Sequence, residues 1–119
     1  MRDHSELTLR KQSDFSRVYK QGKSRGSRFA VILYRRNGLK FTRTAFVASK
    51  KVGNSVERNR SRRLMRAAYR TFEPDIKRGY DIIFVARAGI IGCKEPEVER
   101  QLKKSLESAG ILTGNSNEK

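Results

Sequence analysis

The sequence predicts an α+β fold of the α/β-sandwich type, with helices packed on a single sheet, because two patterns alternate along the chain. Apolar runs of strand length occur at residues 29–34, 43–49 and 80–87. Between and around them, apolar residues recur every three or four positions, which is typical of amphipathic helices. The 119 residues suffice for one domain with one core. We therefore expect a single domain over residues 1–112 and a disordered tail over 113–119.

The first predicted helix begins after Ser13, whose hydroxyl can cap the free backbone N–H groups of the first turn. Gly22 is expected to end this helix. Its apolar face consists of Phe15, Val18 and Tyr19. The polar and basic residues 23–28 then form either a loop or a short edge strand.

The three apolar runs are predicted to form one sheet. The first two, separated by the turn signal Asn37-Gly38, are expected to pair antiparallel. A predicted helix over residues 55–72 lies between the second and third runs, which makes a β-α-β unit and implies parallel pairing of these two strands. Asn54 and Glu57 have the spacing of a capping box at the start of this helix.

The helix over 55–72 has two different faces. Its apolar face is expected to contain Val56, Leu64, Ala68 and Phe72, with Met65 and Tyr69 beside them. The opposite side carries Asn59, Arg62, Arg63, Arg66 and Arg70, which form one contiguous stripe. A last amphipathic helix is predicted to begin at Pro96 and to end at Gly110.

The charge of the chain points to a polyanionic partner. Its 28 Lys and Arg residues against 12 Asp and Glu give a formal net charge of +16, which repels itself in the compact state. Nucleic acid is the expected partner, because each neutralised phosphate releases a condensed counterion. An anionic membrane surface and a merely soluble basic surface are the alternatives. The predicted RNA-binding residues are Lys50, Lys51, Arg58, Asn59, Arg60, Arg62, Arg63, Arg66 and Arg70.

Aromatic residues near the N-terminus have two possible roles. Phe15 and Tyr19 either pack in the core or form a surface on which unpaired bases stack, an interaction that tolerates any base. Phe46 lies on a predicted strand that leads to Lys50 and Lys51, and we assign it to the same surface.

Side chains typical of catalysis are not grouped in this sequence. His4 stands alone, and Cys93 has no His nearby in the sequence. The acidic residues offer no convergent set for two-metal chemistry, and no glycine-rich phosphate loop occurs. We therefore expect no catalytic residue, no metal ligand, no cofactor bound by the protein and no small-molecule substrate. The lone cysteine and the lack of an apolar signal core favour a reducing cytoplasm and no membrane partner.

These features together resemble the bacterial ribonuclease P protein family, over residues of about 7–109. The resemblance is carried by Ser49-Lys50-Lys51-Val52-Gly53-Asn54-Ser55-Val56-Glu57-Arg58-Asn59-Arg60, Arg62-Arg63-Leu64-Met65-Arg66, Asp14-Phe15-x-x-Val18-Tyr19 and Gly79-Tyr80-Asp81-Ile82-Ile83-Phe84-Val85-Ala86-Arg87. It implies a fold of the ribosomal protein S5 domain 2-like type, in the order α-β-β-β-α-β-α, with a left-handed β-α-β crossover that is rare in proteins. It also implies a subunit that binds the catalytic RNA of ribonuclease P. That enzyme removes the 5′ leader of precursor tRNA with Mg²⁺ held by the RNA.

The resemblance further implies roles for individual residues. It places Arg58, Asn59, Arg60, Arg62, Arg63 and Arg66 against the catalytic RNA. Phe15 and Tyr19 match aromatic positions in a cleft between the first helix and the sheet, where the single-stranded leader binds, which favours stacking over core packing. A third aromatic of that cleft stays open, because Tyr34 is one residue out of register. The alternatives are a ribosomal or other structural RNA-binding protein without a processing role, and a self-sufficient nuclease.

Overall fold

The computed structural model describes residues 8–113. Its elements are α1 (Gln12–Gln21), β1 (Lys23–Gly26), β2 (Ala30–Arg36), β3 (Arg43–Val47), α2 (Ser55–Phe72), β4 (Tyr80–Ala86) and α3 (Glu95–Ala109). Two short 3₁₀ turns, η2 (Glu73–Asp75) and η3 (Ala88–Ile90), follow α2 and β4. This is the order α-β-β-β-α-β-α that the resemblance implies, and residues 23–28 contain a strand rather than only a loop.

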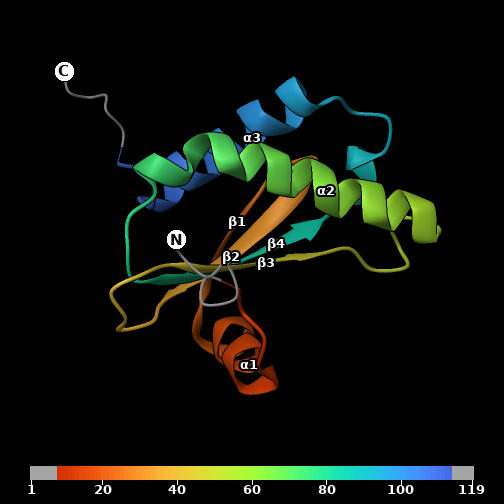
Figure 1. The fold of residues 1–119 in the computed structure, drawn as a ribbon. Helices are drawn as coiled ribbons and strands as arrows, with labels where there is room; N and C mark the ends of the chain where they lie inside the picture. Colours follow the sequence, from red (N-terminus) through yellow and green to blue (C-terminus); the bar gives the residue numbers. More distant parts are fainter. Residues whose placement is uncertain (1–7, 114–119) are drawn as a thin grey trace, which may run out of the picture.

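The helices lie on both faces of one four-stranded sheet (Figure 1). The helices α2 and α3 pack against each other on one face, and α1 lies on the other. The strand order is β1-β2-β4-β3, with β3 at one edge and β1 at the other. The helix that carries the basic residues therefore lies across the face opposite α1.

The predicted antiparallel pairing of residues 29–34 with 43–49 is wrong, because β4 lies between β2 and β3. The strand β4 pairs antiparallel with β2 and parallel with β3, so the predicted parallel pairing is confirmed. Ile82, Ile83 and Phe84 are fully buried although they point to alternate faces, and only an inner strand covered on both faces allows this. The left hand of the crossover from β3 through α2 to β4 stays a prediction.

Each face of the sheet has its own apolar core, because successive residues of a strand point to opposite faces. Phe84 points toward α2 and α3 and belongs to the larger core, together with Met65 of α2. Ile83 and Ala45 point the other way and pack with Val18 of α1 in a smaller core. The sequence position of a strand residue thus decides which helix it meets.

The start of α2 is held by the predicted capping box, which is confirmed. The Asn54 side chain accepts a hydrogen bond from the Glu57 backbone N–H at 2.9 Å, and the Glu57 carboxylate accepts one from the Asn54 N–H at 3.0 Å. Gly53 precedes the box with φ of +151°, and a Cβ at this position would lie 2.0 Å from Glu57 Oε1. The sharp entry into α2 therefore requires glycine.

The predicted start of α1 differs from the observed one. The helix begins at Gln12, its N-cap is Lys11, and no side chain caps it, so Ser13 lies inside the first turn. The Leu9 backbone N–H donates to the Thr44 carbonyl of β3 at 2.9 Å. The start of α1 therefore has no side-chain cap, and the segment before it is instead hydrogen-bonded to β3.

The predicted apolar face of α2 also needs correction. Its buried residues are Ser61, Met65, Ala68, Tyr69 and Phe72. Val56 is 74% exposed, and Leu64 only flanks the core. Ser61 can be buried because its hydroxyl donates to the Glu57 carbonyl one turn earlier, at 2.8 Å. A polar residue thus occupies a core position that apolar periodicity alone would not select.

The C-terminal end of the described chain is bound to the domain. Gly110 ends α3 in the left-handed conformation, with φ of 77°, as predicted. The Thr113 backbone N–H then donates to the Asp75 carbonyl at 2.8 Å. Residues 114–119, which make up the rest of the expected tail, lie outside the described residues.

Candidate nucleic-acid interface

The basic stripe on α2 is present as predicted and is open to solvent. Asn59, Arg63, Arg66 and Arg70 are exposed, and Arg58, Arg60 and Arg62 are partly exposed. Over residues 8–113, every ion pair involves Arg17 or Arg43, and neither belongs to the stripe. Ion pairs within residues 8–113 therefore do not neutralise the positive charge of this face.

Three arginines of α2, of which only Arg62 belongs to the stripe, are oriented by neighbouring polar groups. Arg58 donates to the Gly53 carbonyl at 3.2 Å, and Arg62 donates to the Asn59 side-chain oxygen. Arg60 donates to the Cys93 carbonyl at 2.9 Å, which turns it toward the loop before α3. These bonds leave the guanidinium charges unpaired while they restrict the rotamers, and that lowers the entropy lost on binding a phosphate.

Exposed lysines precede the arginine row of α2. Lys50 and Lys51 are exposed in the turn before the helix. Farther along the helix, the Arg66 guanidinium lies over the Phe46 ring, 5.3 Å from its centroid. The cationic surface thus runs from the β3–α2 turn to the last turns of the helix, over an aromatic residue of the edge strand.

The structure separates the three aromatics assigned to one surface. Phe15 is half-buried against the smaller core, and Tyr19 is 51% exposed on the same helix. Phe46 lies on the opposite face of the sheet, where its ring stacks on Phe84 with 5.0 Å between centroids and meets Tyr69 edge-on at 6.0 Å. Its assignment to the surface of Phe15 and Tyr19 is wrong, because strand alternation points it toward α2.

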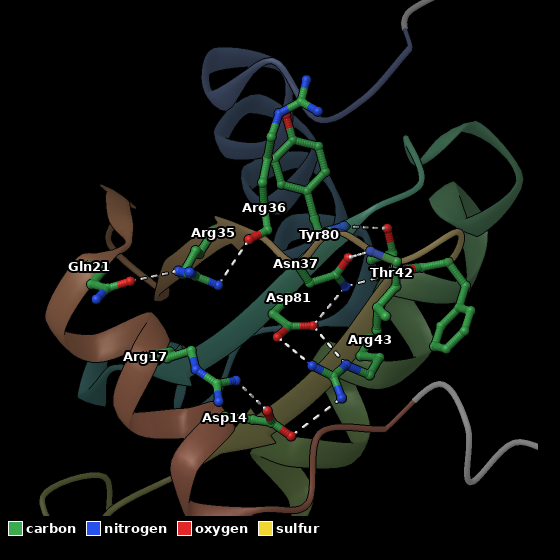
Figure 2. A network of polar contacts seen from close by, with 12 residues as sticks. Asp14, Arg17, Gln21, Arg35, Arg36, Asn37, Thr42, Arg43, Tyr80 and Asp81 are labelled. Atoms are coloured by element: carbon green, nitrogen blue, oxygen red, sulfur yellow. Dashed lines mark hydrogen bonds and ion pairs between the residues drawn. The ribbon is translucent and has the colours of Figure 1, made fainter.

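A polar network that was not predicted from the sequence joins α1 to the sheet (Figure 2). Arg43 donates from Nε and Nη2 to the two Asp81 oxygens, at 2.8 and 2.7 Å, and from Nη1 to Asp14 at 3.3 Å. Both carboxylates are buried, and Asn37 also donates to Asp81, at 2.9 Å. Hydrogen bonding to Asp81 is the main cause that raises the pKa of Arg43 above its ordinary value. A lysine would not reproduce this two-pronged contact.

One sequence signal could have revealed that network. Arg43 is the first residue of β3 and Asp81 the second of β4, two strands that were correctly expected to pair in parallel, and the structure places the two residues directly opposite each other. Asp14 lies in the first turn of α1, where a negative charge is favourable. Its carboxylate also faces Arg17 and Arg43, so it connects α1 to β3.

Groups that could support protein-based catalysis do not come together in the described part of the chain. No three His, Cys, Asp or Glu side chains among residues 8–113 lie close enough to hold a metal ion. Burial raises the pKa of the Cys93 thiol, the Glu97 carboxylate raises it further, and the thiol donates to the Gly89 carbonyl at 3.2 Å. A thiol with these neighbours is a poor nucleophile. None of the helices within 8–113 combines the length and apolar character needed to cross a membrane.

Fold and surface together define a small α+β protein of the nucleic-acid-binding class, whose unpaired cations follow one helix. The sequence profile of the Ribonuclease P family matches residues 4–110. The chain belongs to the ribonuclease P protein family.

Individual relatives and solved structures agree with this assignment. The chain is 38% identical to the ribonuclease P protein component of a Thermoanaerobacter species, over 92% of this chain and 94% of the relative. It is 43% identical to that of Alkaliphilus metalliredigens, over 88% and 87%. The Staphylococcus aureus RNase P protein superimposes with a TM-score of 0.80 at 29% identity, covering 89% of this chain and 97% of that one. The Thermotoga maritima protein gives 0.67 at 28%, covering 92% and 98%. The predicted fold class is confirmed, and the function is that of a ribonuclease P protein subunit.

Proposed function

We propose that the basic stripe of α2 binds the catalytic RNA of ribonuclease P and that the chain itself performs no hydrolysis. The observation that carries the proposal is the exposed row of Asn59, Arg63, Arg66 and Arg70 with no ion-pair partner within residues 8–113. Arginine's planar, forked guanidinium suits phosphate recognition. In this proposal the Mg²⁺ ions that support cleavage are held by the RNA, since the described residues offer no set of protein ligands. The subunit is proposed to act in the cytoplasm.

The α1 side of the molecule is proposed to bind the 5′ leader of precursor tRNA. Tyr19 exposes half of its surface there, and Phe15 lies next to it on the same helix. Aromatic rings of this kind stack unpaired bases irrespective of their sequence. Because mature tRNA has no leader, such a contact would favour substrate over product. This distinguishes the proposal from that of a ribosomal or structural RNA-binding protein, which needs no leader contact.

Reconstitution at low magnesium tests the proposal. The chain is mixed with the ribonuclease P RNA of a Thermoanaerobacter relative and with precursor tRNA, and cleavage is followed against RNA alone and protein alone. We expect faster cleavage with the RNA and the protein together than with the RNA alone, and no cleavage with the protein alone. Neutralisation of five single-strand phosphates would give a slope of log affinity against log salt of about −3.5. A slope near zero, or cleavage by the protein alone, would contradict the proposal.

Charge reversal on the stripe gives a sharper test. The double variant Arg62→Glu and Arg66→Glu should bind the RNA at least tenfold more weakly, because it replaces two phosphate-facing cations with acids. The matched control is Lys103→Glu with Lys104→Glu, two exposed residues of α3 with the same change in net charge. Equal losses in the two double variants would show that net charge, rather than the stripe, determines affinity.

A further inference from the structure

A pocket of about 210 Å³ opens where the last turns of α2 pass the edge strand β3. Its walls include Thr44 and Phe46 from the strand, Arg66, Tyr69 and Arg70 from the helix, and Glu73 after it. It lies at the C-terminal end of the basic stripe and on the face opposite α1. It is therefore separate from the surface proposed for the leader.

The aromatic wall of this pocket is held rigidly. Phe46 is fixed between Phe84, with nearly parallel rings 13° apart, and the edge of Tyr69. The Arg66 guanidinium lies 5.3 Å from the Phe46 centroid. Because Phe84 covers one face of the Phe46 ring and Arg66 lies over the ring, a flat ligand entering here meets the planar guanidinium, which the ring supports from behind. Bases stack well on such a guanidinium plane.

The charged groups of the pocket restrict the ligand further. Over residues 8–113 neither Arg66, Arg70 nor Glu73 forms an ion pair. Two arginines beside one carboxylate leave the lining cationic, so it attracts a phosphate, whereas an apolar ligand would gain nothing from these charges. The Glu73 carboxylate only accepts hydrogen bonds, so a ligand that contacts it as well offers N–H donors beside its phosphate. A nucleotide with an amino or imino group on its base has all three features.

The volume indicates how much of a nucleotide enters. Pockets for drug-sized ligands measure roughly 300–1,000 Å³. This one is smaller, so it suits one ring system, with the ribose and phosphate left at the opening. The exposed Arg70 stands at that opening and can contact the phosphate.

We propose that this pocket takes one unpaired base of the bound RNA, stacked on the Arg66 guanidinium that Phe46 supports, with its N–H groups donating to Glu73 and its phosphate near Arg70. The proposal rests on the RNA-binding function of the stripe. It adds a site where a single base is recognised at the end of a surface that otherwise contacts phosphates. All four RNA bases present an N–H donor on the Watson–Crick edge, and guanine presents two adjacent donors, which match the two oxygens of a carboxylate.

Chemical probing of base edges tests the proposal. The ribonuclease P RNA of a Thermoanaerobacter relative is saturated with the full chain, and the reactivity of the Watson–Crick edge is measured at each unpaired base. We expect one unpaired base to become protected by the parent chain. That protection should be lost in Phe46→Leu and in Glu73→Gln. Glu107→Gln, an equal change at an exposed site on α3, should keep it.

The Glu73 variant separates this proposal from simple charge attraction. Removing an acid beside a cationic stripe should strengthen RNA binding if only charge matters, whereas loss of base protection at saturation identifies a hydrogen-bonding role. Glu73 is exposed, so its replacement leaves the core intact even where Phe46→Leu lowers stability. If RNA binds but no base depends on both residues, the pocket proposal is overturned and the stripe proposal stands. If the parent chain does not bind the RNA, the proposed function itself fails.

Discussion

Arg43 is the residue on which the attachment of α1 to the sheet depends most. It joins Asp81 of β4 to Asp14 of α1, and the two carboxylates are only 2% and 7% exposed. A buried pair need not stabilise a fold relative to apolar side chains of the same shape, but removal of one partner leaves the other charged and unpaired. Removal of one charged partner should therefore lower the free energy of unfolding much more than replacement of the whole pair by apolar side chains.

Arg43→Ala should lower the free energy of unfolding by about 3–5 kcal/mol, because Asp81 loses both of its guanidinium donors. The measurement is urea denaturation followed by circular dichroism. Arg17→Ala is the control, since that side chain is 53% exposed in its ion pair with Asp14. Exposed pairs contribute less than about 1 kcal/mol. Similar losses in the two variants would mean that the buried network does not hold α1 in place.

Tyr69 makes the stability sensitive to alkaline pH. Burial, together with the Glu73 carboxylate, raises the pKa of its hydroxyl above the ordinary value of 10. The unfolded chain therefore releases this proton first and binds fewer protons than the folded chain, so the free energy of unfolding falls as pH rises above about 10. Between pH 8 and pH 11 the parent should lose about 1 kcal/mol more than Tyr69→Phe. Parallel curves for the two proteins would contradict this effect.

Among the elements, α2 depends on its first turn for its position. Asn54→Ala removes the oxygen that caps the Glu57 N–H and should cost about 1 kcal/mol of stability. Asn54→Ser is the matched control, because serine caps nearly as well and should stay within about 0.5 kcal/mol of the parent. Thermal melting of the three proteins measures the difference. Equal melting temperatures for the alanine and serine variants would show that tertiary packing alone fixes the start of the helix.

The elements also show which parts of the fold could be predicted from the sequence. The capping box at Asn54 and the stop at Gly110 were predicted because each acts over a few residues. The pairing of 29–34 with 43–49 was wrong because strand order is set by distant contacts. The run at 80–87 is apolar at successive positions, which marks a strand buried on both faces and favours the middle of the sheet. That signal was available and should have separated the other two strands.

The candidate site, like the fold, could be predicted from the sequence only where its features depend on residues close together in the chain. The basic stripe follows from helical spacing alone, and the structure displays it without ion pairs inside residues 8–113. Phe46 was placed on the wrong surface because alternation along a strand tells which residues share a face but not which helix covers that face. The Arg43 network was missed for a related reason. Its members are 38 and 29 residues apart in the sequence, and only the folded sheet brings them together.

For the molecule as a whole, the two faces of the sheet separate the proposed contacts to two RNA partners, the catalytic RNA on the α2 face and the 5′ leader on the α1 face. The α2 face presents unpaired arginines suited to phosphates, and the α1 face presents Tyr19, an aromatic suited to bases. A net charge of +16 attracts any nucleic acid, so charge alone cannot distinguish precursor from mature tRNA. Discrimination must come from a contact that only the precursor offers. In this fold, the exposed ring of Tyr19 on the α1 face is a group suited to that contact.

Tyr19→Ala tests this division of roles. Its ring is half exposed, so its removal should leave the fold intact. The loss of one stacked base should weaken the binding of precursor tRNA to the reconstituted enzyme by about tenfold. This loss lies within the roughly 1–3 kcal/mol that a base stacked on an aromatic ring contributes. Binding of mature tRNA should stay unchanged, because it has no leader to stack. Tyr19→Phe keeps the ring and should retain the preference for precursor. The measurement is equilibrium binding of both tRNAs to enzyme assembled with each variant. If the alanine variant lost the same affinity for both tRNAs, or if the phenylalanine variant behaved like it, the ring would not be reading the leader, and the two faces would share a single, purely electrostatic role.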